Sequence, residues 1–169
     1  MIRLKNVLVP TDFGEASETA LTYGRDLART FGATLHVLHV HDDVFSSALG
    51  VEGSVPDFSE AQRRAEASAR QRLEASVGDD DRRELGARAI LVTSPNPAKT
   101  TVSYAMEANI DLIVMGTHGR GAMAHLLMGS VAEKVVRLAP CPVLTVRHPE
   151  HEFVLPDALQ AVTRSAGRP

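Results

Sequence analysis

The sequence predicts an α/β domain in which one open, all-parallel sheet is covered by helices on both faces. Five short apolar runs alternate along the chain with longer segments whose apolar residues recur at helical spacing. The runs are apolar almost throughout, which is typical of strands buried on both faces. A chain of 169 residues is long enough for one such domain. We expect the domain to cover residues 1–148 and a C-terminal tail to cover 149–169.

The first half of the chain begins with the Val-rich run NVLVP, which predicts a strand over 6–10. The next segment predicts a helix over 17–31, with Ser17 as its N-cap and Gly32 at the C-terminal position that favours glycine. The apolar stripe expected on this helix consists of Ala20, Tyr23, Leu27, Ala28 and Phe31. The run TLHVLHV predicts the second strand, over 34–40.

A loop is expected over 42–56, where Gly, Ser and Pro are scattered among residues of mixed polarity. From about 58 to 77, apolar residues recur every four positions among many Arg and Glu. This pattern predicts a helix with a narrow apolar seam and a solvated, charged outer face. The segment GDDDRRELG predicts a polar break without secondary structure, and ARAILVT predicts a third strand over 87–93.

The remaining elements follow at short intervals. Asn96 is expected to cap a helix that has Pro97 at its first position. The run DLIVMG predicts a strand over 111–116, a helix is expected at about 130–139, and PVLTVR predicts the last strand over 142–147.

Bulk properties exclude several classes of function. The net charge of −3 is unlike the basic surplus of a dedicated nucleic-acid binder. The single cysteine, Cys141, excludes an internal disulfide, and the first apolar run is too short for a signal peptide or a membrane span. We therefore expect a cytoplasmic protein with no nucleic-acid or membrane partner.

Glycine is concentrated between the fourth strand and the helix that follows it. The spacing is Gly116-x2-Gly119-x9-Gly129-Ser130, with Arg120 inside it. Backbone amides at the start of a helix favour an anion, glycines allow phosphate oxygens to approach, and arginine supplies a mobile positive charge. The alternative is a loop whose glycines serve turn geometry and whose Ser130 is a simple helix cap. These residues alone leave both interpretations open.

The residues at the carboxyl ends of the strands are the other candidates, because open α/β sheets bind ligands there, where the strand order reverses. They are Pro10-Thr11-Asp12 after the first strand and Val40-His41-Asp42 after the second.

The long glycine spacing, placed after DLIVMG and before VAEKVVRLAPCPVLTVR, resembles the ATP-binding branch of the universal stress protein family. NVLVPTDFGEAS and DLARTFGATLHVLHV resemble that family's first strand and loop and its first helix and second strand, so the similarity covers about residues 4–147. It implies a Rossmann-like fold of the adenine nucleotide α-hydrolase type with strand order 3-2-1-4-5.

The resemblance also implies the positions of a nucleotide site. Gly116, Gly119, Gly129 and Ser130 would line the phosphates and ribose, beside Met115, Arg120 and Val131. Val40 would meet the adenine through its backbone, and Pro10, Thr11 and Asp12 would face the nucleoside. Asp12 would accept from a ribose hydroxyl or hold a Mg²⁺, a hard cation that prefers carboxylate oxygen.

The sequence is compatible with two other kinds of site. Asp12 after the first strand is also compatible with a phospho-acceptor receiver domain, but that chemistry needs an acidic residue at the end of the third strand, where Thr93 stands. His39 and His41 share a face of the second strand and could bind zinc with Asp42, although no fourth ligand with tight spacing is evident.

The last strand is expected at an edge of the sheet, with no helical pattern after it to cover it. Such a strand tends to pair with another chain, and the resemblance implies a homodimer through this strand. The expected interface residues are Val143, Leu144, Thr145 and Val146.

The function expected is that of a dimeric, ATP-binding stress-response or regulatory protein. No general base for hydrolysis is evident from the spacing of the residues, so the nucleotide is expected to be a ligand and not a substrate. One alternative is a slow Mg²⁺-dependent ATPase. The other is a dimeric interaction module that binds a different adenylate, such as AMP or cyclic AMP, or none.

Overall fold

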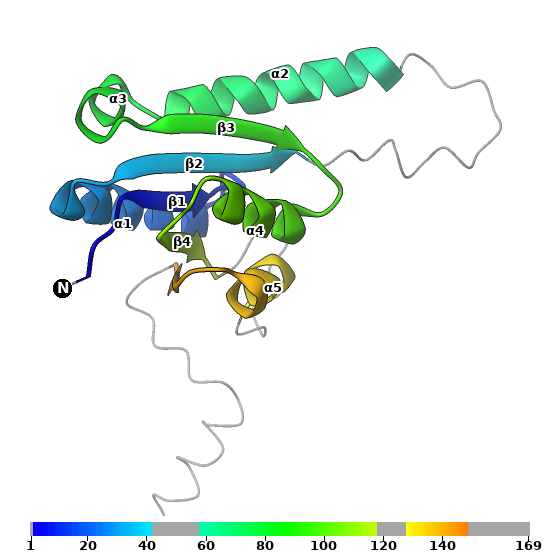
Figure 1. Ribbon diagram of the computed structural model, residues 1–169. Helices are drawn as coiled ribbons and strands as arrows, with labels where there is room; N and C mark the ends of the chain where they lie inside the picture. The colour runs from blue at the N-terminus through cyan, green and yellow to red at the C-terminus, as the bar shows by residue number, and fades with distance from the viewer. Residues whose placement is uncertain (1, 42–57, 118–127, 149–169) are drawn as a thin grey trace, which may run out of the picture.

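The computed structural model describes residues 2–41, 58–117 and 128–148. Five strands form one sheet in the order β3-β2-β1-β4-β5, and every neighbouring pair is parallel, so the predicted fold class and strand order are confirmed (Figure 1). The strands are β1 (Asn6–Pro10), β2 (Thr34–His41), β3 (Arg88–Thr93), β4 (Leu112–Gly116) and β5 (Val143–Val146). The helices are α1 (Glu15–Phe31), α2 (Phe58–Ser76), α3 (Asp79–Leu85), α4 (Pro97–Glu107) and α5 (Ser130–Leu138).

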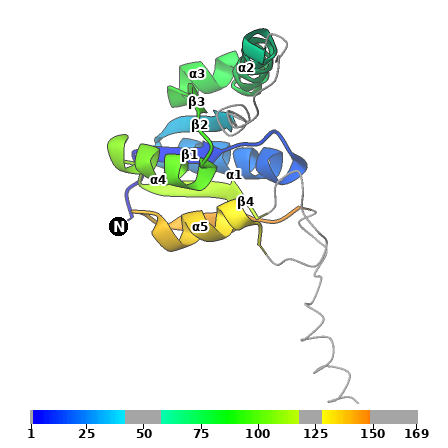
Figure 2. The same ribbon diagram turned by 90° about the vertical axis from the view of Figure 1, so that its right-hand side faces the viewer.

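The sheet has an apolar layer on each face because successive side chains of a strand point to opposite sides. Val7 and Val9 of β1 pack into the core under α1, α2 and α3, whereas Leu8 packs into the core under α4 and α5. Figures 1 and 2 show the helices divided between the two sides of the sheet in this way. Strands buried on both faces explain the continuous apolar runs in the sequence.

Helix α1 differs from the prediction in where it begins and in which side it buries. It begins at Glu15 with Gly14 as its N-cap, so the prediction that Ser17 caps it is wrong. Tyr23 and Phe31 of the expected stripe are each 41% exposed, and the buried side is centred on Ser17, Ala20, Leu21, Gly24 and Ala28. The reason is a close approach at Gly24, where a Cβ would lie 2.4 Å from Cγ2 of Val9. The helix turns this small residue, and not its aromatic ones, toward β1.

Helix α3 replaces the polar break that the sequence analysis predicted over GDDDRRELG. Its start is held by Asp81, whose Oδ2 accepts from the backbone N–H of Gly78 at 3.3 Å, and its end is Gly86 in the left-handed conformation at φ 56°. Leu85 and Asp81 are its buried residues. Seven residues with one buried apolar side chain are too few to show helical periodicity, so the pattern missed this element.

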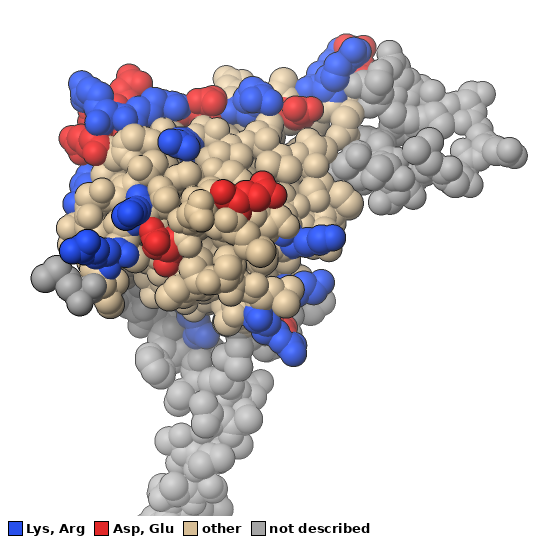
Figure 3. Space-filling view, viewed as in Figure 1, with Lys and Arg blue, Asp and Glu red and all other residues tan. Residues whose placement is uncertain are grey.

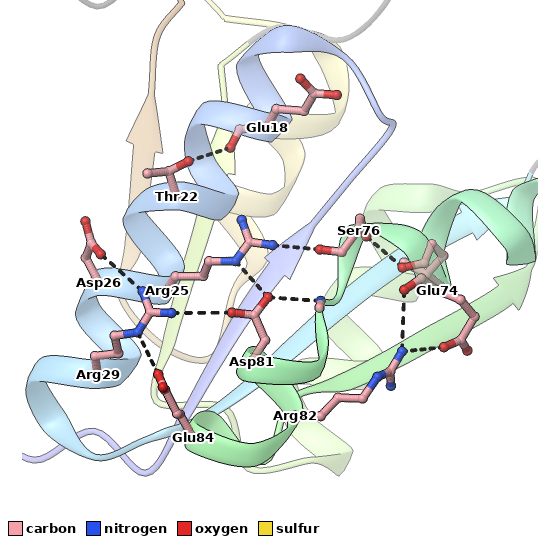
Figure 4. Close-up of polar contacts among 12 residues, drawn as sticks. Glu18, Thr22, Arg25, Asp26, Arg29, Glu74, Ser76, Asp81, Arg82 and Glu84 are labelled. Atoms are coloured by element: carbon pink, nitrogen blue, oxygen red, sulfur yellow. Dashed lines mark hydrogen bonds and ion pairs between the residues drawn. The ribbon is translucent and has the colours of Figure 1, made fainter.

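Three helices are joined by an ion network centred on the buried carboxylate of Asp81 (Figure 4). Its carboxylate is 2.9 Å from Nε of Arg25 and 3.6 Å from Nη2 of Arg29, both on α1. Arg25 also donates to the carbonyl of Ser76 at the end of α2, at 2.7 Å. Because Asp81 is only 5% exposed, this network fixes the α2–α3 corner on α1.

The outer side of α2 carries charges that pair with each other. Arg64 pairs with Glu60, and Arg70 lies 3.5 Å from Glu66. Figure 3 shows the charged side chains following one another over α2 and α3. These exposed pairs confirm the prediction of a solvated, charged face.

A polar pair lies within the layer between the sheet and α4. His36 of β2 is 2% exposed, and its Nδ1 shares a hydrogen bond of 2.8 Å with the hydroxyl of Tyr104. Nε2 of His36 is buried and has no hydrogen-bond partner among the residues that the structure describes. Burial, reinforced by the charge of Arg88, lowers the pKa of His36 below its usual value, so the folded protein holds this imidazole neutral.

Replacing Asp81 with Ala should lower the free energy of unfolding by about 3 kcal/mol, because Arg25 would lose its buried partner. Urea denaturation measures the change. The matched control is Asp80→Ala, whose ion pair with Arg83 is exposed and should contribute less than about 1 kcal/mol. Equal losses in the two variants would contradict a special role for the buried pair.

The stability of the protein should fall on the acid side of pH 6.5, the usual pKa of histidine, because the unfolded chain binds a proton at His36 that the folded protein takes up only at lower pH. Above that pH both states are neutral at His36 and this contribution is complete. Urea midpoints between pH 7.5 and 5 measure the effect. His36→Leu should flatten the dependence, and an unchanged slope would show that His36 does not contribute.

Candidate functional site

The carboxyl ends of β1 and β4 form the place where the strand order reverses. From β1 the chain crosses to β2 on one side, whereas β4 and β5 lie on the other. The arrowheads in Figure 1 show that the carboxyl ends of the strands lie at the same end of the sheet. Helix α1 begins at that end, directly after β1. Open α/β sheets bind ligands in the crevice formed at this point.

The loop between β1 and α1 is held by a chain of hydrogen bonds. The N–H of Phe13 donates to Oγ1 of Thr11 at 2.9 Å, and Oγ1 of Thr11 lies 3.1 Å from Oγ of Ser17. Ser17 donates its hydroxyl proton to the carbonyl of Gly14 at 2.8 Å, so Thr11 must be the donor to Ser17. Thr11 and Ser17 are both buried, which makes the loop a fixed part of the domain.

Asp12 lies at the bend of this loop. Its Oδ1 accepts from the N–H of Gly14 at 3.0 Å. The next residue, Phe13, has φ 62°, a left-handed conformation that costs a residue with a Cβ about 1 kcal/mol. Strain of this kind is kept where the surrounding structure compensates for it, often at a functional site.

The end of β2 extends past the carboxyl end of β1. The register of β1 with β2 ends at Pro10 and Leu38, where the N–H of Thr11 donates to the carbonyl of Leu38. Because the backbone groups of successive residues point to alternate sides of a strand, those of Val40 point the same way as those of Leu38, past the end of β1. The side chain of Val40 packs against the core on the α4–α5 face.

The carboxyl end of β4 touches the start of α1. A Cβ on Gly116 would lie 2.8 Å from the backbone carbon of Ala16, so packing by itself requires glycine at this position. The N–H of Thr117 donates to Val146, and the carbonyl of Thr117 accepts from the N–H of Gly129 at 2.6 Å. These contacts bring the start of α1, the end of β4 and the start of α5 together. Met115 is buried and packs on the α4–α5 face.

The two helices that begin near the carboxyl ends of β1 and β4 have glycine caps. Gly14 precedes α1 and Gly129 precedes α5, and neither start has a side-chain cap. In α4, by contrast, Oδ1 of Asn96 accepts from the N–H of Lys99, as predicted.

Ser130 is the first residue of α5, so the alternative that it is a simple helix cap is wrong. A helix start leaves its first N–H groups, here those of Ser130, Val131 and Ala132, without intrahelical acceptors, a setting that favours an anion.

Some predicted site residues lie outside the described residues. These are Gly119 and Arg120 of the glycine stretch and Asp42 of the hypothetical zinc site. His39 and His41 do share a face of β2, with ring centroids 6.3 Å apart. Within residues 2–41, 58–117 and 128–148, no group of three metal-ligating side chains occurs. No helix in these ranges is both long enough and apolar enough to span a membrane.

Comparison with known proteins identifies the family. The sequence model of the universal stress protein family matches residues 3–147. The chain belongs to this family. A universal stress protein of Thermus aquaticus is 37% identical over 144 residues, which cover 85% of this chain and 98% of that protein. The solved structure of the hypothetical protein MJ0577, whose sequence comes from Methanocaldococcus jannaschii, has a TM-score of 0.70 at 27% identity and covers 87% of this chain and 98% of its own.

Two structures with the same fold contain adenine nucleotides. A universal stress protein in complex with cAMP has a TM-score of 0.56, and one from Archaeoglobus fulgidus in complex with dAMP has a TM-score of 0.54. Each is 23% identical to this chain and covers 86% of it. The match covers 98% of the chain in the cAMP complex and 99% of the chain in the dAMP complex. At this identity they show the shared fold, and their ligands are properties of those proteins.

Replacing Gly116 with Ala should destabilise the domain by roughly 2 kcal/mol in the absence of any nucleotide, because β4 and α1 must separate to admit the methyl group. Thermal and urea denaturation of the nucleotide-free protein measure the loss. Gly78→Ala is the control, since a Cβ there would meet only Oδ2 of Asp81, at 4.0 Å. If Gly116→Ala is as stable as this control, Gly116 has a role other than packing.

Proposed function

We propose that this universal stress protein binds ATP in the crevice between the carboxyl ends of β1 and β4. The observation that carries the proposal is that two glycine-capped helices begin at these strand ends: α1, whose Gly14 lies next to Asp12, and α5, whose Gly129 is bonded to Thr117 after β4. The first N–H groups of each helix have no intrahelical acceptor and lie at the positive end of the helix dipole, which suits a polyphosphate. Family membership supports the same choice, since two neighbours of this fold hold adenine nucleotides.

The parts of the nucleotide are assigned to different elements. The triphosphate contacts the amides of Ser130 and Val131, together with Gly119 and Arg120 of the glycine stretch. Asp12, held by Gly14, accepts from a ribose hydroxyl or binds the Mg²⁺ that accompanies ATP. The backbone of Val40 forms hydrogen bonds with the adenine edge, and Pro10 and Thr11 border the nucleoside.

The active form in this proposal is a homodimer formed through β5. This strand is at an edge of the sheet, and Leu144 is 38% exposed on it. An edge strand has one row of backbone groups without a partner strand in its own sheet and can pair with a second copy. The interface comprises Val143, Leu144, Thr145 and Val146. The protein then acts in the cytoplasm, where bound ATP regulates its partners in the stress response.

Protein that is purified and then denatured should release an adenine nucleotide, with ATP as the expected species, identified by mass spectrometry. Isothermal titration of the emptied protein should give affinities in the order ATP, ADP, AMP when Mg²⁺ is present. Release of ADP during incubation would instead favour the slow ATPase. If the emptied protein binds none of these nucleotides or cAMP, the proposal fails.

Asp12→Ala should weaken ATP binding at least tenfold, because it removes the carboxylate from the nucleoside side of the crevice. Glu107→Ala is the matched control: it removes the same charge from the exposed end of α4, next to Ala108, whose carbonyl accepts from Asn6 at the amino-terminal end of β1. Gly129→Val should abolish binding by placing a branched side chain at the start of α5. Both binding variants should remain folded, which circular dichroism checks. Equal affinity of Asp12→Ala and Glu107→Ala for ATP would remove Asp12 from the site.

A further inference from the structure

Three side chains from different elements pack together beside Asp12. The ring of Phe13, in the β1–α1 loop, lies 4.3 Å from the ring of His39 on β2, centroid to centroid, with the planes tilted by 37°. The guanidinium carbon of Arg72 on α2 lies 4.4 Å from the centroid of the same phenyl ring. The contact with Arg72 is a cation–π interaction, and it ties α2 to the loop.

His39 also holds the loop by its backbone. Its Nδ1 is 2.8 Å from the carbonyl oxygen of Thr11. A carbonyl can only accept, so Nδ1 carries the proton and donates it. The imidazole therefore has two contacts with consecutive parts of one loop: a hydrogen bond to the residue before Asp12 and a ring contact with the residue after it.

These contacts explain how the loop keeps its strained shape. Phe13 has a left-handed φ of 62°, which a phenylalanine adopts only if other interactions offset the cost. The left-handed turn allows the N–H groups of Phe13 and Gly14 to bond back to the side chains of Thr11 and Asp12. The position of the Asp12 carboxylate thus depends on the conformation of Phe13, and that conformation depends on His39 and Arg72.

We propose that His39 is the positioning residue of this nucleotide site and that it acts, with Arg72, by holding Phe13 and Thr11 so that Asp12 faces the nucleoside. The inference rests on the proposed function, and it assigns to the Arg72–Phe13–His39 cluster the regulation of that site's affinity. Phe13 already packs against two neighbours, so its role is to hold the loop and not to stack on the adenine base. Because Arg72 belongs to α2, a displacement of α2 changes the affinity for nucleotide.

The hydrogen bond and the ring contact of His39 with the β1–α1 loop can be separated by substitution. In His39→Asn, the amide Nδ2–H replaces the Nδ1–H donor but the ring is lost; in His39→Phe, the ring is retained but the donor is lost. We expect His39→Phe to weaken ATP binding about tenfold, since a hydrogen bond from a fixed donor to a backbone carbonyl is worth up to roughly that factor. His39→Asn retains a donor and should weaken binding less than about threefold. Titration calorimetry measures both. Equal affinities of His39→Phe and the wild-type protein would overturn the proposal.

A double-mutant cycle distinguishes positioning from a general effect on the fold. If His39 acts through Asp12, then adding His39→Phe to Asp12→Asn should change ATP affinity less than about twofold, because the carboxylate that it positions is already absent. A full tenfold loss on that background would show that His39 acts elsewhere.

The contribution of α2 is tested by Arg72→Met, which keeps a long side chain against Phe13 but removes the cation. ATP binding should weaken about threefold, as expected for one cation–π contact. Arg70→Met is the matched control on the same helix: it loses only an exposed pair with Glu66 and should leave the affinity unchanged. The same affinity in both variants would remove Arg72 from the mechanism.

Hydrogen exchange separates failure of this inference from failure of the nucleotide assignment. In the nucleotide-free protein, the amides of Phe13 and Gly14 should exchange at least about tenfold faster in His39→Phe than in the wild-type protein, whereas those of β4 should not change. If no nucleotide binds but the two amides respond in this way, the proposed function fails and the positioning of the loop by His39 stands. Unchanged exchange in His39→Phe would overturn the positioning itself, whatever the protein binds.

Discussion

The close approach of α1 to the sheet is the constraint on which the rest of the structure depends. It occurs at two glycines, Gly24, which lies against Val9, and Gly116, which lies against Ala16. A side chain at either position would push the helix away from β1 or β4. Because α1 lies so near, its first turn and the end of β4 meet at the point where the strand order reverses.

Helix α1 takes part in two separate polar networks. Near its carboxyl-terminal half, Arg25 and Arg29 hold Asp81 and so fix the corner between α2 and α3. At its amino-terminal end, hydrogen bonds of Thr11 and Ser17 shape the loop that carries Asp12. Helix α2 takes part in both, since its carboxyl end is bound through Ser76 and its Arg72 contacts Phe13. A buried ion network thus anchors the helix that also supports the candidate site.

Much of the fold could be predicted from the sequence because the signals are local. The apolar runs of β1, β2 and β4 indicate strands buried on both faces, and Asn96 with Pro97 marks the start of α4 correctly. Candidate residues such as Asp12, Val40 and Ser130 were found because the ends of strands and the starts of helices have known uses. The cluster of Phe13, His39 and Arg72 could not be predicted because its members share no motif and are remote in the chain. Phe13 and His39 are 26 residues apart, and His39 and Arg72 are 33 residues apart. The short helix α3 could not be predicted because a single buried leucine gives no repeating pattern of apolar residues.

The sequence by itself determined the alternation of strands and helices, the all-parallel sheet and the end of the sheet at which the candidate site residues lie. These follow from apolar periodicity and from the few connections that parallel strands allow. Only the tertiary structure decided which side of α1 is buried, why Gly116 must lack a side chain, and how Phe13 keeps a left-handed backbone. Each of these depends on the distance between two elements that are remote in the chain, and no local pattern of residues encodes such a distance.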